Sequence, residues 1–201
     1  MRLFCEKGYS STSVADLLKA TGVGSGSLDS FFPGKQDLLL AVLDAYRSGI
    51  RKMLLEPAWR DVTDPIEKIF SLLAHHRQLI VETDYLYGCP IGSLALEIHE
   101  PDPAVRELLA ANFQAWTDAV LECLLEADRR LPDALDRLSL AEFVLATMEG
   151  AVMQARTFRD VAYFDRAVQE LRNYIEILLY GRPSLSDPVR QALADFGSDQ
   201  R

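Results

Sequence analysis

The stretch GVGSGSLDSFFPGKQDLL, residues 22–39, separates a short amphipathic segment from a long one and decides how the N-terminal part of the chain folds. Gly22 ends the segment before it. Residues 25–31 are predicted to form a second short helix, with Leu28 and Phe32 anchoring its buried side. Two short helices joined by a tight turn make a helix-turn-helix, in which the second helix enters the major groove of DNA.

The exposed start of that second helix is built from small, hydroxyl-bearing residues. Ser25, Gly26 and Ser27 leave room for close approach, and serine hydroxyls can donate to phosphate oxygens or to base edges. Backbone N–H groups at a helix start also favour a phosphate. Ser25, Ser27 and Ser30 are therefore predicted to contact bases or phosphates.

Helical signals continue on both sides of this stretch. Ser13 followed by Asp16 fits an N-cap for a helix over residues 14–21. From Lys35, apolar residues recur at intervals of three and four through Leu55, which predicts one long helix.

The rest of the chain shows the same periodicity and no alternating strand pattern of useful length, so the predicted fold class is all-α. The first helix begins at Met1. Later helices are expected at residues 66–82, capped by Thr63-Asp64-Pro65, and at 91–100, 103–130, 139–160 and 164–181, with a short one at 189–196.

Charge is divided unevenly along the chain. The net charge of the 201 residues is −9, yet residues 1–52 hold seven Lys and Arg against five Asp and Glu, a balance of +2, so residues 53–201 carry −11. This predicts a small, mildly basic head on an acidic body. No run of about 18 apolar residues and no signal-peptide core is present, which predicts a cytoplasmic protein without a membrane partner.

The sequence offers little for catalysis or metal binding. Cys5, Cys89 and Cys123 are far apart, which argues against a disulfide scaffold or zinc site, and adjacent His75 and His76 would point in different directions on a helix. There is no G-x-S-x-G, no phosphate-binding glycine loop and no HExxH. We expect no enzyme activity, no metal and no cofactor.

The segment LFCEKGYSSTSVADLLKATGVGSGSLDSFFPGKQDLL, residues 3–39, resembles the DNA-binding region of the TetR family of bacterial transcriptional regulators. The positions in register with the family pattern are Phe4, Gly8, Tyr9, Thr12, Ser13, Val14, Gly22, Val23, Leu28, Phe32, Lys35, Leu38 and Leu39. YGCPIGSLALEIHE and ATMEGAVMQAR resemble ligand-domain helices of one TetR subgroup.

The resemblance implies a DNA-binding domain over residues 1–50 and a helical effector-binding and dimerisation domain over 51–201. It implies a homodimer, formed through the last two long helices, that binds a palindromic double-stranded DNA operator and is released by a small-molecule effector, most often as a repressor. Ser13 and Lys35 would then hold the DNA backbone, with Arg47 and Arg51 as further candidates.

Two features depart from the family pattern. Family recognition helices usually carry a tyrosine, often followed closely by a histidine, where this chain has Asp29 and Phe31. Asp29 could accept from a cytosine amino group, cap a neighbouring helix, or mark weakened DNA binding. The last option would leave a TetR-like ligand-binding or protein-binding dimer. Family members also have ten or more residues before this point, so a truncated chain or a late start would cost phosphate contacts.

An effector pocket is expected among the long helices. Its candidate lining residues are Phe70, Tyr85, Tyr87, Phe113, Trp116, Met148, Met153 and Arg156. Many aromatics and one cation favour a drug-sized apolar or amphipathic ligand. Glu149 and Gly150 are expected at a close helix crossing. The acidic residues Glu97, Glu100, Asp102 and Glu107 are expected to form a solvated face.

Overall fold

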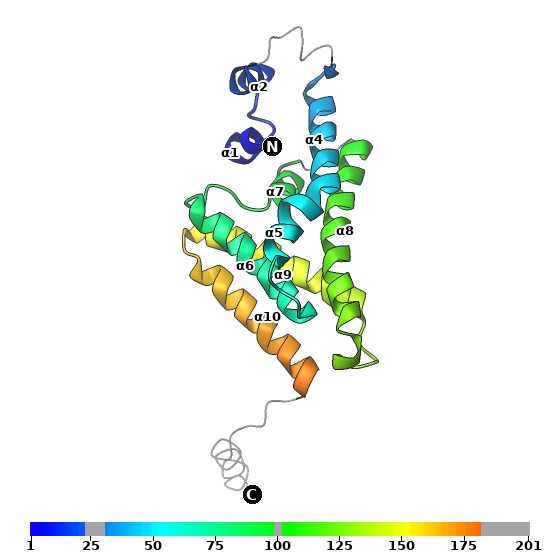
Figure 1. Cartoon of the computed structure of the whole chain (residues 1–201). Helices are drawn as coiled ribbons and strands as arrows, with labels where there is room; N and C mark the ends of the chain where they lie inside the picture. Colours follow the sequence, from blue (N-terminus) through cyan, green and yellow to red (C-terminus); the bar gives the residue numbers. More distant parts are fainter. Residues whose placement is uncertain (23–30, 99–101, 182–201) are drawn as a thin grey trace, which may run out of the picture.

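The computed structural model describes residues 1–22, 31–98 and 102–181, and every regular element in these ranges is a helix (Figure 1). The elements are α1 (Arg2–Lys7), α2 (Val14–Thr21), α4 (Lys35–Ile50), the π-helical turn η1 (Arg51–Leu55), α5 (Glu56–Trp59), α6 (Pro65–Glu82), α7 (Pro90–Glu97), α8 (Pro103–Glu126), the 3-10 turn η2 (Asp128–Arg130), α9 (Arg137–Phe158) and α10 (Ala162–Tyr180). The predicted all-α class is confirmed. The short helices expected near residues 25–31 and 189–196 lie almost wholly outside the described residues.

Local capping signals set several helix ends where the sequence predicts them. Ser13 caps α2: its hydroxyl accepts from the Asp16 N–H, while the Asp16 side chain accepts from the Ser13 N–H. Gly22 ends α2 in the left-handed conformation, with φ +68°. Asp64 caps α6, and Pro65 occupies its first turn, where a missing N–H costs nothing.

The long helix predicted from residue 35 changes its hydrogen-bonding pattern near its end. α4 is α-helical to Ile50, and the chain continues without a break through η1 into α5. π-Helical turns are rare in proteins, and many of those that occur lie at functional sites. Here Met53 and Leu54 of η1 face the central cavity described below.

Two clusters of buried apolar side chains hold the molecule together. The larger cluster lies between α6, α8, α9 and α10 and includes Trp116 and Met148. The smaller cluster joins α1, α2 and α4 to Ile91 of α7 and Val105 of α8. The N-terminal helices therefore pack on residues beyond position 50, and α7 lies next to α1 (Figure 1).

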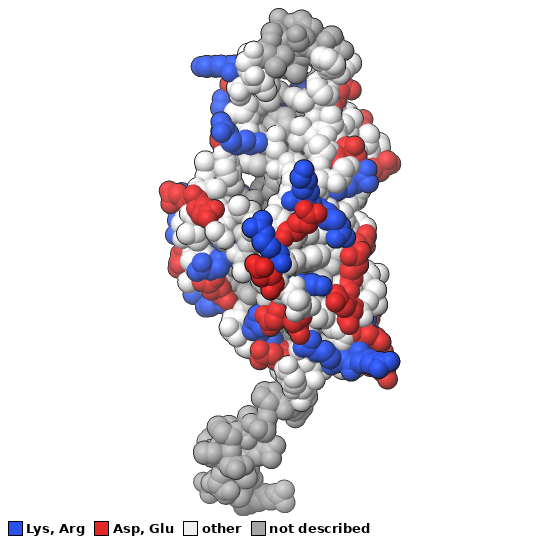
Figure 2. Space-filling model, in the orientation of Figure 1, with Lys and Arg blue, Asp and Glu red and all other residues white. Residues whose placement is uncertain are grey.

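The two ends of the molecule differ in surface charge. Exposed Arg2, Lys7 and Lys19 belong to α1 and α2, and Figure 2 shows mainly Lys and Arg on that flank of the N-terminal end. Asp and Glu mix with Arg over the rest of the visible face. No helix among the described residues is long and apolar enough to cross a bilayer.

Candidate functional site

The turn between α1 and α2 is fastened to α7 by one carboxylate. Glu97, the last residue of α7, accepts hydrogen bonds from the backbone N–H groups of Tyr9 and Ser10, both at 2.7 Å. Gly8 makes the approach possible: its φ is +82°, and a Cβ there would lie 3.0 Å from Glu97 Oε1. A side chain at position 8 would therefore be strained and would crowd the carboxylate.

The same turn is also held by a cation. Lys35 Nζ donates to the backbone oxygens of Tyr9 at 2.9 Å and of Thr12 at 3.1 Å, and it lies 4.2 Å from the centroid of the Tyr9 ring. Lys35 begins α4 and Glu97 ends α7. The backbone N–H groups of the turn are thus bound by the carboxylate of α7, and its backbone carbonyls by the ammonium of α4.

The expected solvated acidic face is only partly present. Burial raises the pKa of Glu97, but hydrogen bonds from the amides of Ser10 and Tyr9 outweigh it, and the net pKa lies below the usual value. Glu97 is therefore an ionised structural group, and that expectation was wrong for it. Asp102 caps α8, with its carboxylate accepting from the Ala104 N–H, and only Glu107 is an exposed side chain without such a role. Glu100 lies outside the described residues.

The residues predicted to contact DNA fall into two groups. Ser25, Gly26, Ser27, Asp29 and Ser30 lie outside the described residues, so their roles stay predictions.

The other candidates, Ser13, Lys35, Arg47 and Arg51, are described by the structure. Ser13 is exposed, and its hydroxyl takes part in the α2 cap. The ammonium of Lys35 is bonded to the turn. Arg47 pairs with Asp44, and Arg51 lies near Glu122.

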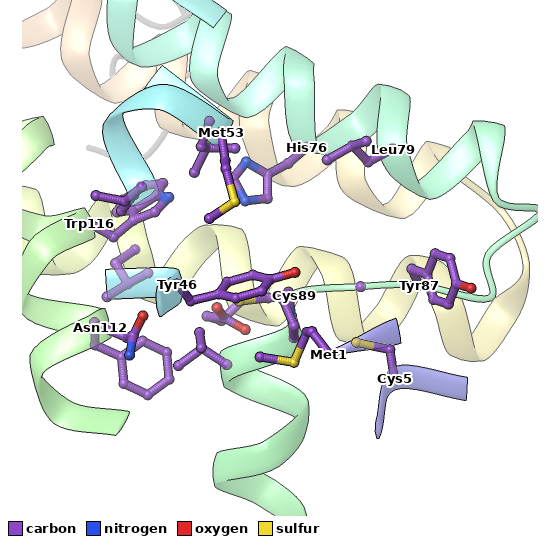
Figure 3. Close-up of a pocket in the computed structure, with 18 of the residues that line it drawn as sticks. Met1, Cys5, Tyr46, Met53, His76, Leu79, Tyr87, Cys89, Asn112 and Trp116 are labelled. Carbon is purple, nitrogen blue, oxygen red and sulfur yellow. The ribbon is translucent and has the colours of Figure 1, made fainter. Parts of the chain in front are cut away.

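A cavity of about 330 Å³ lies between α1 and the helices of the body (Figure 3). Its walls come from six parts of the chain that are distant in sequence, and they are mostly apolar or aromatic. The lining residues are Met1, Arg2, Cys5, Tyr46, Ile50, Met53, Leu54, His76, Leu79, Thr83, Tyr87, Gly88, Cys89, Pro90, Ile91, Asn112, Phe113, Trp116, Leu145 and Glu149. A largely apolar cavity with a few polar groups is the usual form of a small-molecule site.

Some polar side chains in the cavity wall already contact other groups of the protein. Asn112 Nδ2 donates to the Leu43 carbonyl at 3.0 Å and so links α8 to α4. His76 Nδ1 is 3.1 Å from the Leu72 carbonyl, and burial lowers the pKa of this imidazole, which favours its neutral form. Burial also raises the pKa of Tyr46, which keeps its hydroxyl protonated.

Glu149 of α9 lies against α7 at the back of the cavity. A Cβ on Gly92 would come within 2.1 Å of Glu149 Oε2, so this contact needs a glycine in α7. A Cβ on Gly150 would meet nothing within 4 Å. The close approach expected at Gly150 is therefore formed at Gly92 instead, because Glu149 points toward α7 and Gly150 does not.

The predicted effector-binding residues are divided among three places. Tyr87, Phe113 and Trp116 line the central cavity. Tyr85, Met153 and Arg156 surround a second hollow of about 360 Å³ on the other side of Cys89 and Glu149. Phe70 and Met148 line neither; they are buried in the larger core, at 5% and 0% exposure.

Arg156 of α9 forms hydrogen bonds with the loop that precedes α7 and with α7 itself. Its guanidinium donates to the carbonyls of Tyr85 and Leu86 and to the Ser93 hydroxyl, at 3.1 to 3.4 Å. Tyr85 has φ +61°, so the loop is held in an unusual conformation. Arg156 thus positions the segment that leads into the cavity wall.

Sequence reasoning missed several cavity residues, above all Tyr46, Cys89, Asn112 and Glu149. For Glu149 one signal was available: a glutamate inside the largely apolar run ATMEGAVM is an unusual residue to bury. No comparable signal in the sequence marks Tyr46 or Asn112.

Helix α7 joins the cavity to the turn. Residues 89–91 at its start line the cavity, and Glu97 at its end holds the backbone of Tyr9 and Ser10. The helix has eight residues, about two turns. A change in the cavity wall is therefore one short rigid element away from the helix-turn-helix.

Comparison with known families agrees with this layout. Residues 1–42 match the family described as bacterial regulatory proteins, tetR family. Residues 65–170, more than half of the chain, match the C-terminal domain described as that of LmrA/YxaF-like transcriptional regulators.

Individual relatives cover nearly the whole chain. An uncharacterized HTH-type transcriptional regulator of Mycobacterium tuberculosis is 28% identical over 179 residues, which cover 86% of this chain and 88% of the relative. The HTH-type transcriptional repressor DhaR of Mycobacterium sp. strain GP1 is 26% identical over 188 residues, with 92% and 91% covered.

Solved structures share the arrangement of helices. The regulatory protein TetR from Rhodobacter sphaeroides aligns with a TM-score of 0.77 and 25% identity, covering 85% of this chain and 91% of that one. A TetR transcriptional regulator from Chloroflexus aurantiacus aligns with a TM-score of 0.75 and 29% identity, covering 87% and 88%. The chain belongs to the TetR family of transcriptional regulators, with an N-terminal helix-turn-helix DNA-binding domain followed by a helical C-terminal domain.

Proposed function

We propose that this regulator is a ligand-responsive repressor that binds a palindromic operator as a homodimer and leaves it when a small molecule fills the central cavity. The observation that carries the proposal is the position of α7, with one end in the cavity wall and the other on the helix-turn-helix. The relative DhaR, which bears the name repressor, supports the sign of regulation. Such a regulator acts in the cytoplasm, where the bacterial chromosome lies.

The DNA-binding unit is proposed to comprise residues 1–50, and residues 51–201 to form the effector and dimer domain. Ser13, Ser25, Ser27 and Ser30 would contact bases or phosphates. Lys35, whose ammonium already binds two carbonyls, would act by shaping the turn. Two recognition helices of a dimer would enter successive major grooves about 34 to 36 Å apart.

The dimer is proposed to form through α9 and α10. These helices expose large apolar side chains, and Phe143 of α9 packs edge-to-face on Tyr174 of α10. The exposed members are Leu138, Phe143, Met153, Phe158, Tyr174, Ile177 and Tyr180. Apolar surface of this kind marks an interaction site. Light scattering after size-exclusion chromatography is expected to give a dimer, and a monomer would contradict this part of the proposal.

Release would follow from the connection through α7. A ligand in the cavity displaces residues at the start of α7, and the helix carries that displacement to Glu97 and the turn. The recognition helices of the two subunits are then no longer spaced to fit the operator. Ligand and DNA therefore favour different conformations of the dimer.

The experiment is a gel shift with the DNA upstream of the regulator's own gene, at low and moderate salt. We expect a specific complex that competitor DNA does not remove. If no specific complex forms, the chain is instead a TetR-like ligand-binding or protein-binding dimer with impaired DNA recognition. Asp29→Tyr separates two readings of that residue: it tightens binding if Asp29 only repels phosphates, and it costs sequence specificity if Asp29 reads a base.

A further inference from the structure

Two polar atoms of the cavity lining are buried without a hydrogen-bond partner among the described residues: Trp116 Nε1 and Glu149 Oε1. Trp116 is only 5% exposed. An unpaired buried polar group costs about 1–3 kcal/mol and requires an explanation. Both residues line the central cavity, and Glu149 also borders the second hollow, so a molecule bound in the cavity would lie next to both side chains.

Glu149 sets the charge of that ligand. Its carboxyl is wedged against Gly92, lies near the Cys89 thiol and forms no ion pair with any described residue. Burial raises the pKa of Glu149, because the ionised form has lost water without gaining a counter-ion. A positive group placed beside this carboxylate would supply the missing counter-ion, whereas an anion would be repelled.

The remaining walls suit the same choice. Tyr46, His76, Phe113 and Trp116 contribute aromatic rings to the cavity wall. Figure 3 shows Tyr46 across from His76 and Trp116, whose rings pack edge-to-face. Aromatic faces attract cations and cover apolar surface.

Arg2 is the only Lys or Arg among the described lining residues. Its side chain is 76% exposed and pairs with Glu6. It offers an anionic ligand no buried partner.

We propose that the central cavity binds a hydrophobic amine as its cation, with the ammonium on Glu149 and the apolar body against Tyr46, Phe113 and Trp116. The volume of about 330 Å³ fits a ligand of one or two rings. This inference rests on the proposed function in that the cavity is taken to be the effector site.

The test is calorimetric titration of the full chain, without DNA, near pH 7.5, with three probes of one shape. These are 1-naphthylmethylamine, a cation; 1-naphthylmethanol, which is neutral; and 1-naphthoate, an anion. We expect the amine to bind at least about tenfold more tightly than the alcohol, and the anion to bind most weakly. Equal affinity for amine and alcohol, tighter binding of the anion, or no binding of any probe would overturn the proposal.

The matched variants are Glu149→Gln and Glu142→Gln, because Glu142 is an exposed residue of the same helix. Glu149→Gln is expected to weaken amine binding about tenfold or more and to change alcohol binding less than about threefold. Glu142→Gln should change neither. Equal weakening of amine and alcohol by Glu149→Gln would show a merely structural role and defeat the proposal, and if that variant does not fold, the ranking of the three probes on the unaltered chain decides.

Operator binding by the same preparation, followed by fluorescence anisotropy, keeps the two proposals apart. Operator binding without preference for the amine overturns the ligand class alone. Preference for the amine without operator binding overturns the repressor function and leaves the ligand class standing.

Discussion

Two glutamates contact opposite ends of α7 and have opposite surroundings: Glu97 is the last residue of α7, and Glu149 of α9 lies against its first turn. Glu97 accepts two backbone N–H groups, and its pKa is lowered although burial opposes this. Glu149 is wedged beside Gly92 with an unpaired oxygen, and burial raises its pKa. One carboxylate completes the fold, whereas the other is left incomplete by it.

The difference distinguishes a structural carboxylate from the carboxylate that we propose binds a ligand, without reference to residue type. A charge that the backbone satisfies fixes the position of a segment, here the turn between α1 and α2. A charge that the fold buries and leaves unpaired lowers stability, and proteins retain such groups at sites where function requires them. The helix between the two residues connects these roles.

The largest effect is expected on operator affinity when Glu97 is replaced. Glu97→Ala should lower operator affinity about tenfold, equivalent to about 1.4 kcal/mol, because the turn that supports the helix-turn-helix loses its tie to α7. Anisotropy with a labelled operator measures it. Glu107→Ala, which removes an exposed carboxylate from α8, is the control. Equal affinities for both variants would show that Glu97 does not position the DNA-binding helices.

A change of charge should move stability in opposite directions at the two ends. Glu97→Gln should lower the free energy of unfolding by about 1 kcal/mol at pH 7, and Glu149→Gln should raise it by a similar amount. Urea unfolding as a function of pH checks both signs.

The pH dependence follows from the direction of each pKa shift. Glu97 has a lowered pKa, so its contribution is full above the ordinary value of 4.5 and is lost as the pH falls through the lowered one. Glu149 has a raised pKa, so its penalty is absent below 4.5 and grows as the pH rises through the raised value. A Glu149→Gln variant that is less stable than the parent at pH 8 would contradict the comparison.

Two glycines offer a finer test of the unsatisfied end. Gly92→Ala forces the Glu149 carboxyl out of its slot, while the flexible side chain can move aside, so the unfolding free energy should change by less than about 1 kcal/mol. Its effect should fall on the amine preference of the cavity. Gly150→Ala meets no neighbour and should stabilise α9 by about 0.5–1 kcal/mol with ligand binding unchanged. Equal ligand affinities for both variants would remove Gly92 from the site.

A last test concerns the cation that holds the same turn as Glu97. Lys35→Met removes two hydrogen bonds to carbonyls and should cost about 1 kcal/mol of stability. The salt dependence of operator binding should keep its slope, because the ammonium is occupied within the protein. A slope reduced by about 1 would instead assign Lys35 to a phosphate.

The helices were predictable because their signals are local. Ser13 and Asp16, or Asp64 and Pro65, lie within one turn of each other, and their effect does not depend on distant residues. The π-helical turn was not predicted, since the apolar spacing over residues 51–55 also fits an α-helix.

The cavity was predictable only in part. Tyr87, Phe113 and Trp116 were identified by type, but type did not separate them from Phe70, which is equally aromatic and lies in the core. Glu149 acquires its position through Gly92, on another helix, and a single sequence contains no record of that contact. Burial of this kind is decided by tertiary packing.

The length of α7 is itself under constraint. An α-helix turns by about 100° and advances about 1.5 Å for each residue. One residue inserted between Gly92 and Glu97 would leave the slot for Glu149 intact and rotate the terminal carboxylate roughly a quarter of a circle away from Tyr9 and Ser10. The rotational phase between the two ends of this helix is thus a fixed dimension of the regulator, as definite as the repeat of the DNA it is proposed to bind.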